Sequence, residues 1–194
     1  MKRIGVFGGT FNPIHIGHLA VAQTAQEAMR LDKVIFVPSN WPPHKNSDTI
    51  AAARHRFNMV RLAIKGNSFF AISDFEIKRP GKSYTIDTLK YLRRIFPKGA
   101  KIFFIIGGDT LPHLKEWKYI DGILKMANFV VVNRPGQFRK NRGKRIRYYS
   151  VSMSGIDISS SNIRSRIAQS RATKYYVPDN VLSYIRKHRL YKTK

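Results

Sequence analysis

Short apolar runs and longer periodic stretches alternate along the 194-residue chain. The short runs are rich in Ile, Val and Phe, as buried strands are, and the longer stretches repeat their apolar positions at helical spacing. The short runs predict strands at residues 4–7, 33–37, 69–72, 101–106, 128–132 and 145–151. The periodic stretches predict helices at residues 15–29, 51–65, 85–96, 117–126, 160–169 and 178–187.

This alternation of strands and helices predicts an α/β fold. Right-handed connections between successive strands give a Rossmann-like, doubly wound and mostly parallel sheet with helices on both faces. No internal repeat is visible, and residues 1–194 are predicted to form one domain. Ligands of such folds bind beyond the carboxyl ends of the strands, where the strand order reverses. We therefore expect the site in the turns after the first, second and fourth strands.

The chain is strongly basic, with 36 Lys and Arg against 11 Asp and Glu and a net charge of +25. A field of this sign attracts anionic ligands such as nucleotides, and it would also attract nucleic acid without sequence preference. The absence of cysteine excludes disulfides and thiolate metal sites. Because no apolar run reaches membrane-spanning length and no signal peptide is seen, we expect a soluble, cytoplasmic protein with no membrane partner.

The first predicted turn carries the most informative motif, GGTFNPIHIGH at residues 8–18. Gly8 and Gly9 let the backbone turn sharply and approach a bulky anion closely. The helix that follows opens with unpaired N–H groups and a positive dipole end, which favour a phosphate. His15 and His18 stand three residues apart in its first turn, so both imidazoles can face the same point. The motif is neither a P-loop nor the dinucleotide fingerprint.

A proline-rich loop, PSNWPPHKNSD, follows the second predicted strand. Its three prolines stiffen it, and long loops that are not disordered are often functional. The loop presents Asn40, His44 and Lys45, and the lysine ammonium is suited to a phosphate. We interpret this loop as a second part of the site.

A third candidate anion site opens the helix predicted at residues 160–169. Ser159, Ser160 and Ser161 supply hydroxyls beside the free N–H groups of the helix start, and Arg164 follows one turn later. A serine here also serves as an ordinary helix cap. Together these groups suit the β- and γ-phosphates of a nucleoside triphosphate.

These segments resemble the bacterial nicotinate mononucleotide adenylyltransferases, which belong to the nucleotidylyltransferases with an H-x-G-H motif. The resemblance rests on GGTFNPIHIGH, on the PPHK loop and on ISSSNIR, in which Ser161 replaces the usual threonine. It also rests on SYTIDTL at residues 83–89, on GGD at residues 107–109 and on Trp117. It covers nearly the whole chain, and one departure is Lys118, where the family commonly has tyrosine.

The resemblance implies adenylyl transfer from ATP to nicotinate mononucleotide, giving deamido-NAD and pyrophosphate in NAD biosynthesis. It implies that the catalytic residues are His15, His18 and Arg164. The ATP site would comprise Gly8, Gly9, Phe11, His18, Gly107, Asp109, Ser159, Ser160, Ser161 and Arg164. The mononucleotide site would comprise Thr10, Asn40, His44, Lys45, Thr85, Trp117 and Lys118, with the pyridine ring stacked on the tryptophan. Asp109 would bind the adenosine ribose, or it would cap a helix at residues 111–114, or both.

The acceptor of this reaction is already a phosphate anion, so positioning and charge stabilisation matter more than a strong base. We expect Mg²⁺ to arrive on the ATP phosphates, with no metal cluster in the protein. Alternative acceptors are nicotinamide mononucleotide and another phosphorylated compound. A basic nucleic-acid-binding protein is the alternative of another class, and the lack of a recognisable DNA or RNA motif argues against it. The sequence leaves open whether the chain forms a homo-oligomer.

Overall fold

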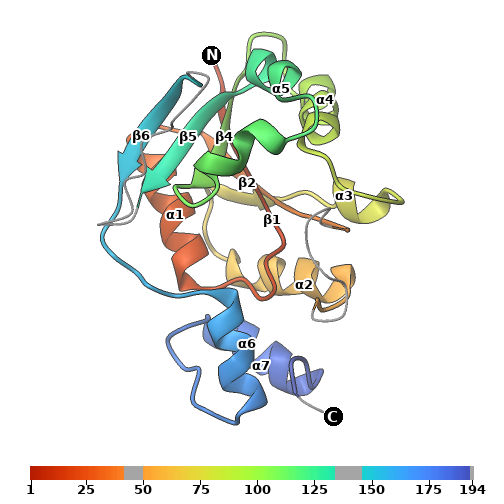
Figure 1. Ribbon diagram of the computed structural model, residues 1–194, viewed down its shortest axis with the longest axis vertical. Helices are drawn as coiled ribbons and strands as arrows, with labels where there is room; N and C mark the ends of the chain where they lie inside the picture. The colour runs from red at the N-terminus through yellow and green to blue at the C-terminus, as the bar shows by residue number, and fades with distance from the viewer. Residues whose placement is uncertain (42–49, 134–145, 193–194) are drawn as a thin grey trace.

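A six-stranded parallel sheet forms the centre of the computed structural model, which describes residues 1–41, 50–133 and 146–192 (Figure 1). The strand order is β3-β2-β1-β4-β5-β6, so the order reverses between β1 and β4. Every neighbouring pair is parallel, which confirms the predicted Rossmann-like, doubly wound sheet. The strands are β1 Arg3–Gly9, β2 Lys33–Pro38, β3 Phe70–Ile72, β4 Lys101–Gly107, β5 Asn128–Asn133 and β6 Tyr148–Ser152.

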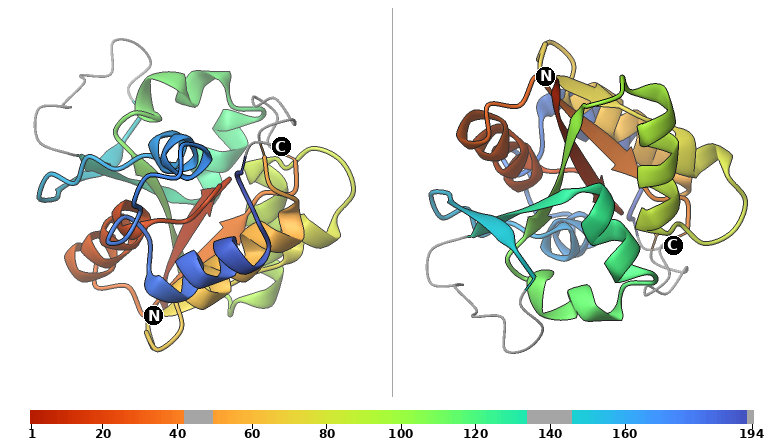
Figure 2. Two further views of the ribbon diagram at one scale, coloured as in Figure 1. Left: turned by 90° about the horizontal axis from the view of Figure 1, so that it is seen from below. Right: turned by 90° about the horizontal axis from the view of Figure 1, so that it is seen from above.

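Helices cover both faces of the sheet, as predicted (Figure 2). One apolar cluster joins the sheet to α1 Ile16–Ala28, α2 Ala53–Ala63, α6 Ser160–Ala168 and α7 Asp179–Lys187. The other joins it to α4 Thr85–Ile95, the 3₁₀ helix η2 Leu111–Glu116 and α5 Ile120–Met126. Within the described parts of the chain, no helix has both the length and the apolar character that crossing a membrane requires.

Alternate residues of the central strands feed these two clusters. On β4, Phe103 and Ile105 belong to the cluster with α1 and α2, whereas Ile102, Phe104 and Ile106 belong to the cluster with α4 and α5. Side chains of a strand point to opposite faces in turn, so a strand covered on both sides is apolar throughout. This explains why the sequence shows continuous apolar runs and not an alternation.

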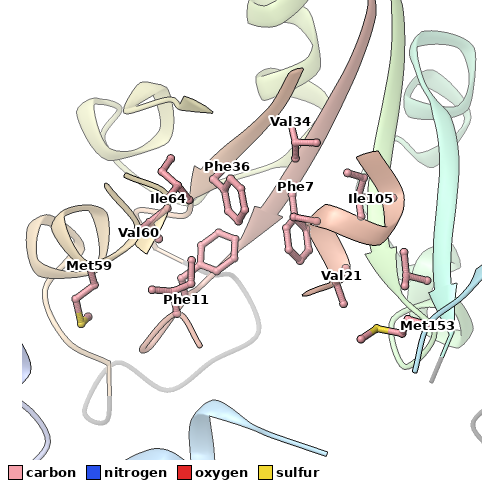
Figure 3. Packing of buried hydrophobic residues seen from close by; sticks show 14 of the residues in the cluster. Phe7, Phe11, Val21, Val34, Phe36, Met59, Val60, Ile64, Ile105 and Met153 are labelled. Atoms are coloured by element: carbon pink, nitrogen blue, oxygen red, sulfur yellow. The ribbon is translucent and has the colours of Figure 1, made fainter. Parts of the chain in front are cut away.

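Three phenylalanine rings pack together where β1 leads into the first turn (Figure 3). The ring centroids of Phe7 and Phe11 are 5.6 Å apart, and those of Phe11 and Phe36 are 5.8 Å apart. Phe11 has a φ of 48°, in the left-handed region that a bulky residue rarely adopts. Its ring is 2% exposed, so apolar burial offsets the backbone strain and fixes the turn.

The helices and strands differ from the predicted ones at three places. The helix expected at residues 117–126 begins three residues late, at Ile120, because its N-cap Tyr119 has a φ of 60°. The one-turn helix α3, Phe75–Lys78, was not predicted, because four residues are too few to show a helical period. The start of the strand expected at residues 145–151 lies outside the described residues, and β6 continues to Ser152.

A polar contact joins α2 to α7, which lie side by side. The Tyr184 hydroxyl is 3.0 Å from His55 Nδ1 and accepts a hydrogen bond from Asn58 Nδ2 at 3.1 Å. Because that hydroxyl accepts from Asn58, its own proton is available to His55. Burial lowers the pKa of His55 below 6.5, and the neighbouring His188 and Arg54 lower it further.

Because the pKa of His55 is lower in the folded protein than in the unfolded chain, the free energy of unfolding decreases as the pH falls. Below pH 6.5 the unfolded chain binds a proton at this site more readily than the folded chain does, and this favours unfolding. We expect the Tm of the unmodified protein to drop more than that of His55→Gln between about pH 7 and about pH 5. Circular dichroism melts of both proteins measure this difference. Parallel Tm curves would show that His55 contributes nothing to the pH dependence.

Candidate active site

A cavity of about 690 Å³ lies at the carboxyl ends of β1 and β4, where the strand order reverses. It is lined by the turn after β1, the first turns of α1, α4 and α6, and the end of β4. Segments from both ends of the chain therefore meet at one place, as the sequence predicts. The predicted site residues that line the cavity are Gly8, Gly9, Thr10, Phe11, His15, His18, Thr85, Gly107, Asp109, Trp117, Ser159, Ser160 and Ser161.

The two histidines of the motif lie against each other at the start of α1. Their ring centroids are 3.7 Å apart, and the planes are inclined by 31°. His18 Nδ1 accepts the backbone N–H of His15, at 3.3 Å, so the neutral His18 ring carries its proton on Nε2. Phe11 meets the His18 ring edge-on at 5.1 Å and limits its rotation. His18 is thus oriented by its neighbours at the edge of the cavity that it lines.

Gly17 allows the His15 ring and the carbonyl group of Ile158 to lie close to the backbone of α1. A Cβ at this position would lie 3.1 Å from His15 Nδ1 and 3.7 Å from the carbonyl oxygen of Ile158. The first contact is closer than a methyl group normally tolerates, so a side chain would displace the His15 ring. The glycine between the two histidines is therefore required by packing as well as by the motif.

The start of α6 is bonded directly to the turn after β1. Ser159 caps the helix by accepting the Asn162 N–H at 3.1 Å, and the Ser160 hydroxyl donates to the Pro13 carbonyl at 2.8 Å. Arg164 donates to the Asn12 carbonyl at 2.9 Å and to the Ser161 hydroxyl at 3.4 Å. No acidic residue lies in the first turn of α1 or α6. Both helix starts thus present a positive dipole end to the cavity that they line.

Asn12 joins this turn to a residue near the end of the chain. Its Oδ1 accepts the Tyr191 hydroxyl at 2.8 Å and the Ala51 N–H at 3.0 Å. Burial raises the pKa of Tyr191, so the phenol keeps the proton that it donates. The shape of the turn after β1 therefore depends on the segment before α2, on α6 and on the segment after α7.

The end of β4 forms another wall of the cavity. A side chain at Gly107 would collide with Asp109 Oδ1, so the carboxyl group of Asp109 folds back over the glycine. Asp109 is exposed and lines the cavity, which fits a hydrogen-bonding role toward a ribose. The sequence also suggested Asp109 as a helix cap, and this was wrong, because the N-cap of η2 is Thr110.

The wall around Trp117 combines an aromatic ring with a buried carboxyl group. Trp117 lines the cavity and meets the Phe104 ring edge-on at 5.6 Å. Glu76, from the unpredicted helix α3, lines the same cavity and accepts the Thr88 hydroxyl at 2.5 Å. Burial raises the pKa of Glu76, and hydrogen bonds from Thr88 and Ser83 oppose this shift. Glu76 is thus a carboxyl group that holds its proton to a higher pH than an exposed one.

Three predicted site residues lie beside the cavity, and two are not described. Asn40 donates its N–H to the Ser83 hydroxyl at 3.0 Å and its amide to the Arg79 carbonyl at 2.9 Å. The Lys118 ammonium lies 4.7 Å from the centre of the Tyr84 ring. Arg164 is half-buried against Asn12 and, like these two, is not among the described residues that line the cavity. His44 and Lys45 lie outside the described residues.

Arg56 and Glu76 are two residues of this region that the sequence motifs did not indicate. Arg56 is buried on α2 together with Met59 and Val60, three and four residues later. A charged residue at an apolar position of a helical period is a signal that could have identified it. No comparable pattern identifies Glu76, because α3 is only one turn long.

This chain is similar to a known protein family over most of its length and to named relatives over nearly all of it. Residues 6–166 match the model of the cytidylyltransferase-like family. A "probable nicotinate-nucleotide adenylyltransferase" of Thermoanaerobacter sp. (strain X514) is 42% identical, over 98% of this chain and 94% of that protein. One of Clostridium perfringens (strain SM101 / Type A) is 43% identical, over 99% of each.

A solved structure shares the fold at lower sequence identity. It is that of Plasmodium falciparum nicotinic acid mononucleotide adenylyltransferase complexed with NaAD, with a TM-score of 0.84 and 22% identity over 98% of each chain. The family match, the two full-length relatives and the resemblance of the motifs lead to the same assignment. This chain belongs to the cytidylyltransferase-like family, among the nicotinate-nucleotide adenylyltransferases.

Proposed function

We propose that this protein transfers the adenylyl group of ATP to nicotinate mononucleotide, giving deamido-NAD and pyrophosphate, in the cytoplasm. The observation that carries the proposal is the convergence of two helix starts, α1 and α6, on one cavity that also contains His18 and Trp117. The helix starts suit phosphates, and the indole suits a flat pyridine ring.

In this reaction an oxygen of the acceptor phosphate attacks the α-phosphorus of ATP. A new P–O bond forms as the bond to the bridging oxygen of the β-phosphate breaks, and pyrophosphate leaves with the electron pair. The Nε2–H of His18 would donate to the α-phosphate, where negative charge accumulates. Arg164 and the hydroxyls at the start of α6 would hold the leaving pyrophosphate.

Mg²⁺ would bind mainly to the triphosphate. Among the described residues, no group of three His, Cys, Asp or Glu side chains is arranged to hold a metal ion. Mg²⁺ commonly uses phosphate oxygens and water with few protein ligands, so the donors around this cavity fit an ion that arrives with ATP. When bound, the ion would neutralise part of the triphosphate charge.

A panel of acceptors tests the proposal. Pyrophosphate release from ATP is measured with the acid mononucleotide, the amide mononucleotide, phosphopantetheine and glycerol phosphate. We expect kcat/KM to be highest for the acid, by about tenfold to a hundredfold over the amide, because backbone N–H donors near Thr85 and Lys118 would bind a carboxylate and oppose an NH₂ group. An equal or higher value for the amide would reassign the acceptor. A gel shift at physiological salt tests the nucleic-acid alternative.

Trp117→Ala should weaken the acid and the amide acceptor by a similar factor. Stacking on the indole does not distinguish a carboxylate from an amide, so the ratio of the two kcat/KM values should stay nearly unchanged. Steady-state kinetics with both acceptors measures this ratio. Trp117→Phe is the matched control, because it keeps an aromatic face against Phe104. A ratio that moved by more than about tenfold would make Trp117 itself the discriminating residue.

A further inference from the structure

One buried arginine holds the backbone of the candidate site. Arg56 is 1% exposed, and its three kinds of nitrogen bond to three different carbonyl oxygens. Nε donates to Ala51 at 2.8 Å, and the two terminal nitrogens donate to Thr10 at 2.8 Å and to Asn40 at 2.9 Å. A guanidinium carries its donors in a rigid planar fork. The three carbonyl groups are therefore held at a fixed mutual spacing.

These carbonyl groups belong to the segments that would bind the two substrates. Thr10 lies in the turn after β1 and lines the cavity beside Gly9. Asn40 lies just after β2, and its N–H bonds to Ser83, which lines the wall of the cavity that contains Thr85 and Trp117. In the sequence, Asn40 and Ala51 stand on either side of the loop that carries the predicted acceptor ligands. Arg56 thus joins the phosphate-binding turn to the acceptor side of the site.

The carboxyl group of Glu76 acts on the buried charge of Arg56 only from beyond ion-pair distance. Among the described residues, no Asp or Glu lies within ion-pair distance of its guanidinium, and burial lowers its pKa to about 10. A buried cation without an ion pair is unfavourable, and hydrogen bonds to carbonyl groups offset only part of that cost. An apolar side chain of similar volume would avoid the cost but could not join the three segments.

We propose that Arg56 is a positioning residue for adenylyl transfer, because it sets the distance between the turn after β1 and the segment after β2. This inference rests on the proposed function. The reaction joins two bound substrates, so an error in their relative placement slows the joining step even when each substrate still binds. The expected signature is a low kcat with nearly unchanged binding of each substrate alone.

Two variants of Arg56 and one control separate this role from simple stabilisation. Arg56→Lys keeps the charge but cannot reach three carbonyl groups, and Arg56→Met keeps an extended side chain without charge. Arg61→Met, at an exposed position of the same helix, is the matched control. We expect both Arg56 variants to lower kcat by about 30- to 100-fold, while Arg61→Met leaves it unchanged. Calorimetry should find the affinity for a non-hydrolysable ATP analogue, and for nicotinate mononucleotide alone, within about threefold.

Hydrogen exchange gives a readout that does not require turnover. In Arg56→Lys, the amides of residues 9–11 and 39–41 should exchange faster, while those of β5 stay protected. The proposal is overturned if exchange is unchanged, if kcat stays within about threefold, or if one binary affinity falls as much as kcat. Failure of both variants to fold would assign Arg56 a structural role only, which also overturns it.

The unmodified protein in the same assay tests the proposed function separately. If it used another acceptor, the kcat ratio would be measured with that acceptor, and the role of Arg56 would be judged in the same way. If it turned over none of the four acceptors, the proposed function would fail, and hydrogen exchange alone would decide the role of Arg56.

Discussion

Replacing His18 by alanine is expected to lower kcat by about two to three orders of magnitude, as for the loss of a group that stabilises transition-state charge. The ring is oriented by the His15 N–H and by Phe11, so its Nε2–H is placed before the substrates bind. The KM for the mononucleotide should change much less, because this donor acts mainly on charge that appears during the reaction. Steady-state kinetics with both substrates measures these effects.

Two further variants make the His18 result specific. His18→Asn can still accept the His15 N–H through its Oδ1, but it lacks a donor at the place of Nε2. It should therefore keep the Tm of the unmodified protein and still lose most of the activity. His113→Ala, at an exposed position on η2, should change neither property. An active His18→Asn would show that the histidine serves only to cap the helix.

Arg164→Ala is expected to raise the KM for ATP and to lower kcat, with a combined loss of about 10- to 100-fold in kcat/KM. A charge-assisted hydrogen bond contributes about 1.5–3 kcal/mol, and this variant would remove the bond that we propose to the leaving pyrophosphate. It also releases the Asn12 carbonyl, which Arg164 holds at 2.9 Å. Arg164→Lys keeps the charge but not the two-pronged contact, so it should recover only part of the loss.

Arg171, which is exposed just beyond α6, provides the matched control for Arg164. Arg171→Ala removes the same charge from the same part of the molecule, so it reports the effect of the general electrostatic field. If Arg171→Ala lost as much activity as Arg164→Ala, the field and not a specific contact would explain the result. An equal rise of both KM values in Arg164→Ala would argue against a role in binding the triphosphate.

The strands could be predicted from the sequence because they are continuous apolar runs, and most helices because they are long enough to show a helical period. The four residues of α3 are too few to show one, and nothing local marks the late start of α5 after Tyr119. A tyrosine with positive φ is held by its surroundings and not by its own preference. The late start of α5 therefore arises from tertiary packing that overrides the local pattern, whereas α3 is too short to have a pattern.

The residues predicted to contact substrate were identifiable because they occur together in short motifs. His15 and His18 lie within four residues, and the serines of α6 lie beside Arg164. What the positioning residues bond to could not be identified, since their partners are distant in the sequence. Arg56 bonds to Thr10, 46 residues earlier, and Tyr191 bonds to Asn12, 179 residues earlier. Local patterns contain no information about such pairs.

The hydrogen bonds from Arg164 and Tyr191 to Asn12 have a consequence for the time during synthesis at which the site is complete. A ribosome releases the amino-terminal part of a chain first, and the last sheet strand ends at Ser152. A growing chain can therefore complete its sheet while the turn after β1 still lacks Ser160, Arg164 and Tyr191. Such a chain would have the sheet of the enzyme but an incomplete candidate active site. We expect activity to appear in one late step of synthesis, when the segment from Ser160 to Tyr191 emerges and closes on a turn that was translated long before it.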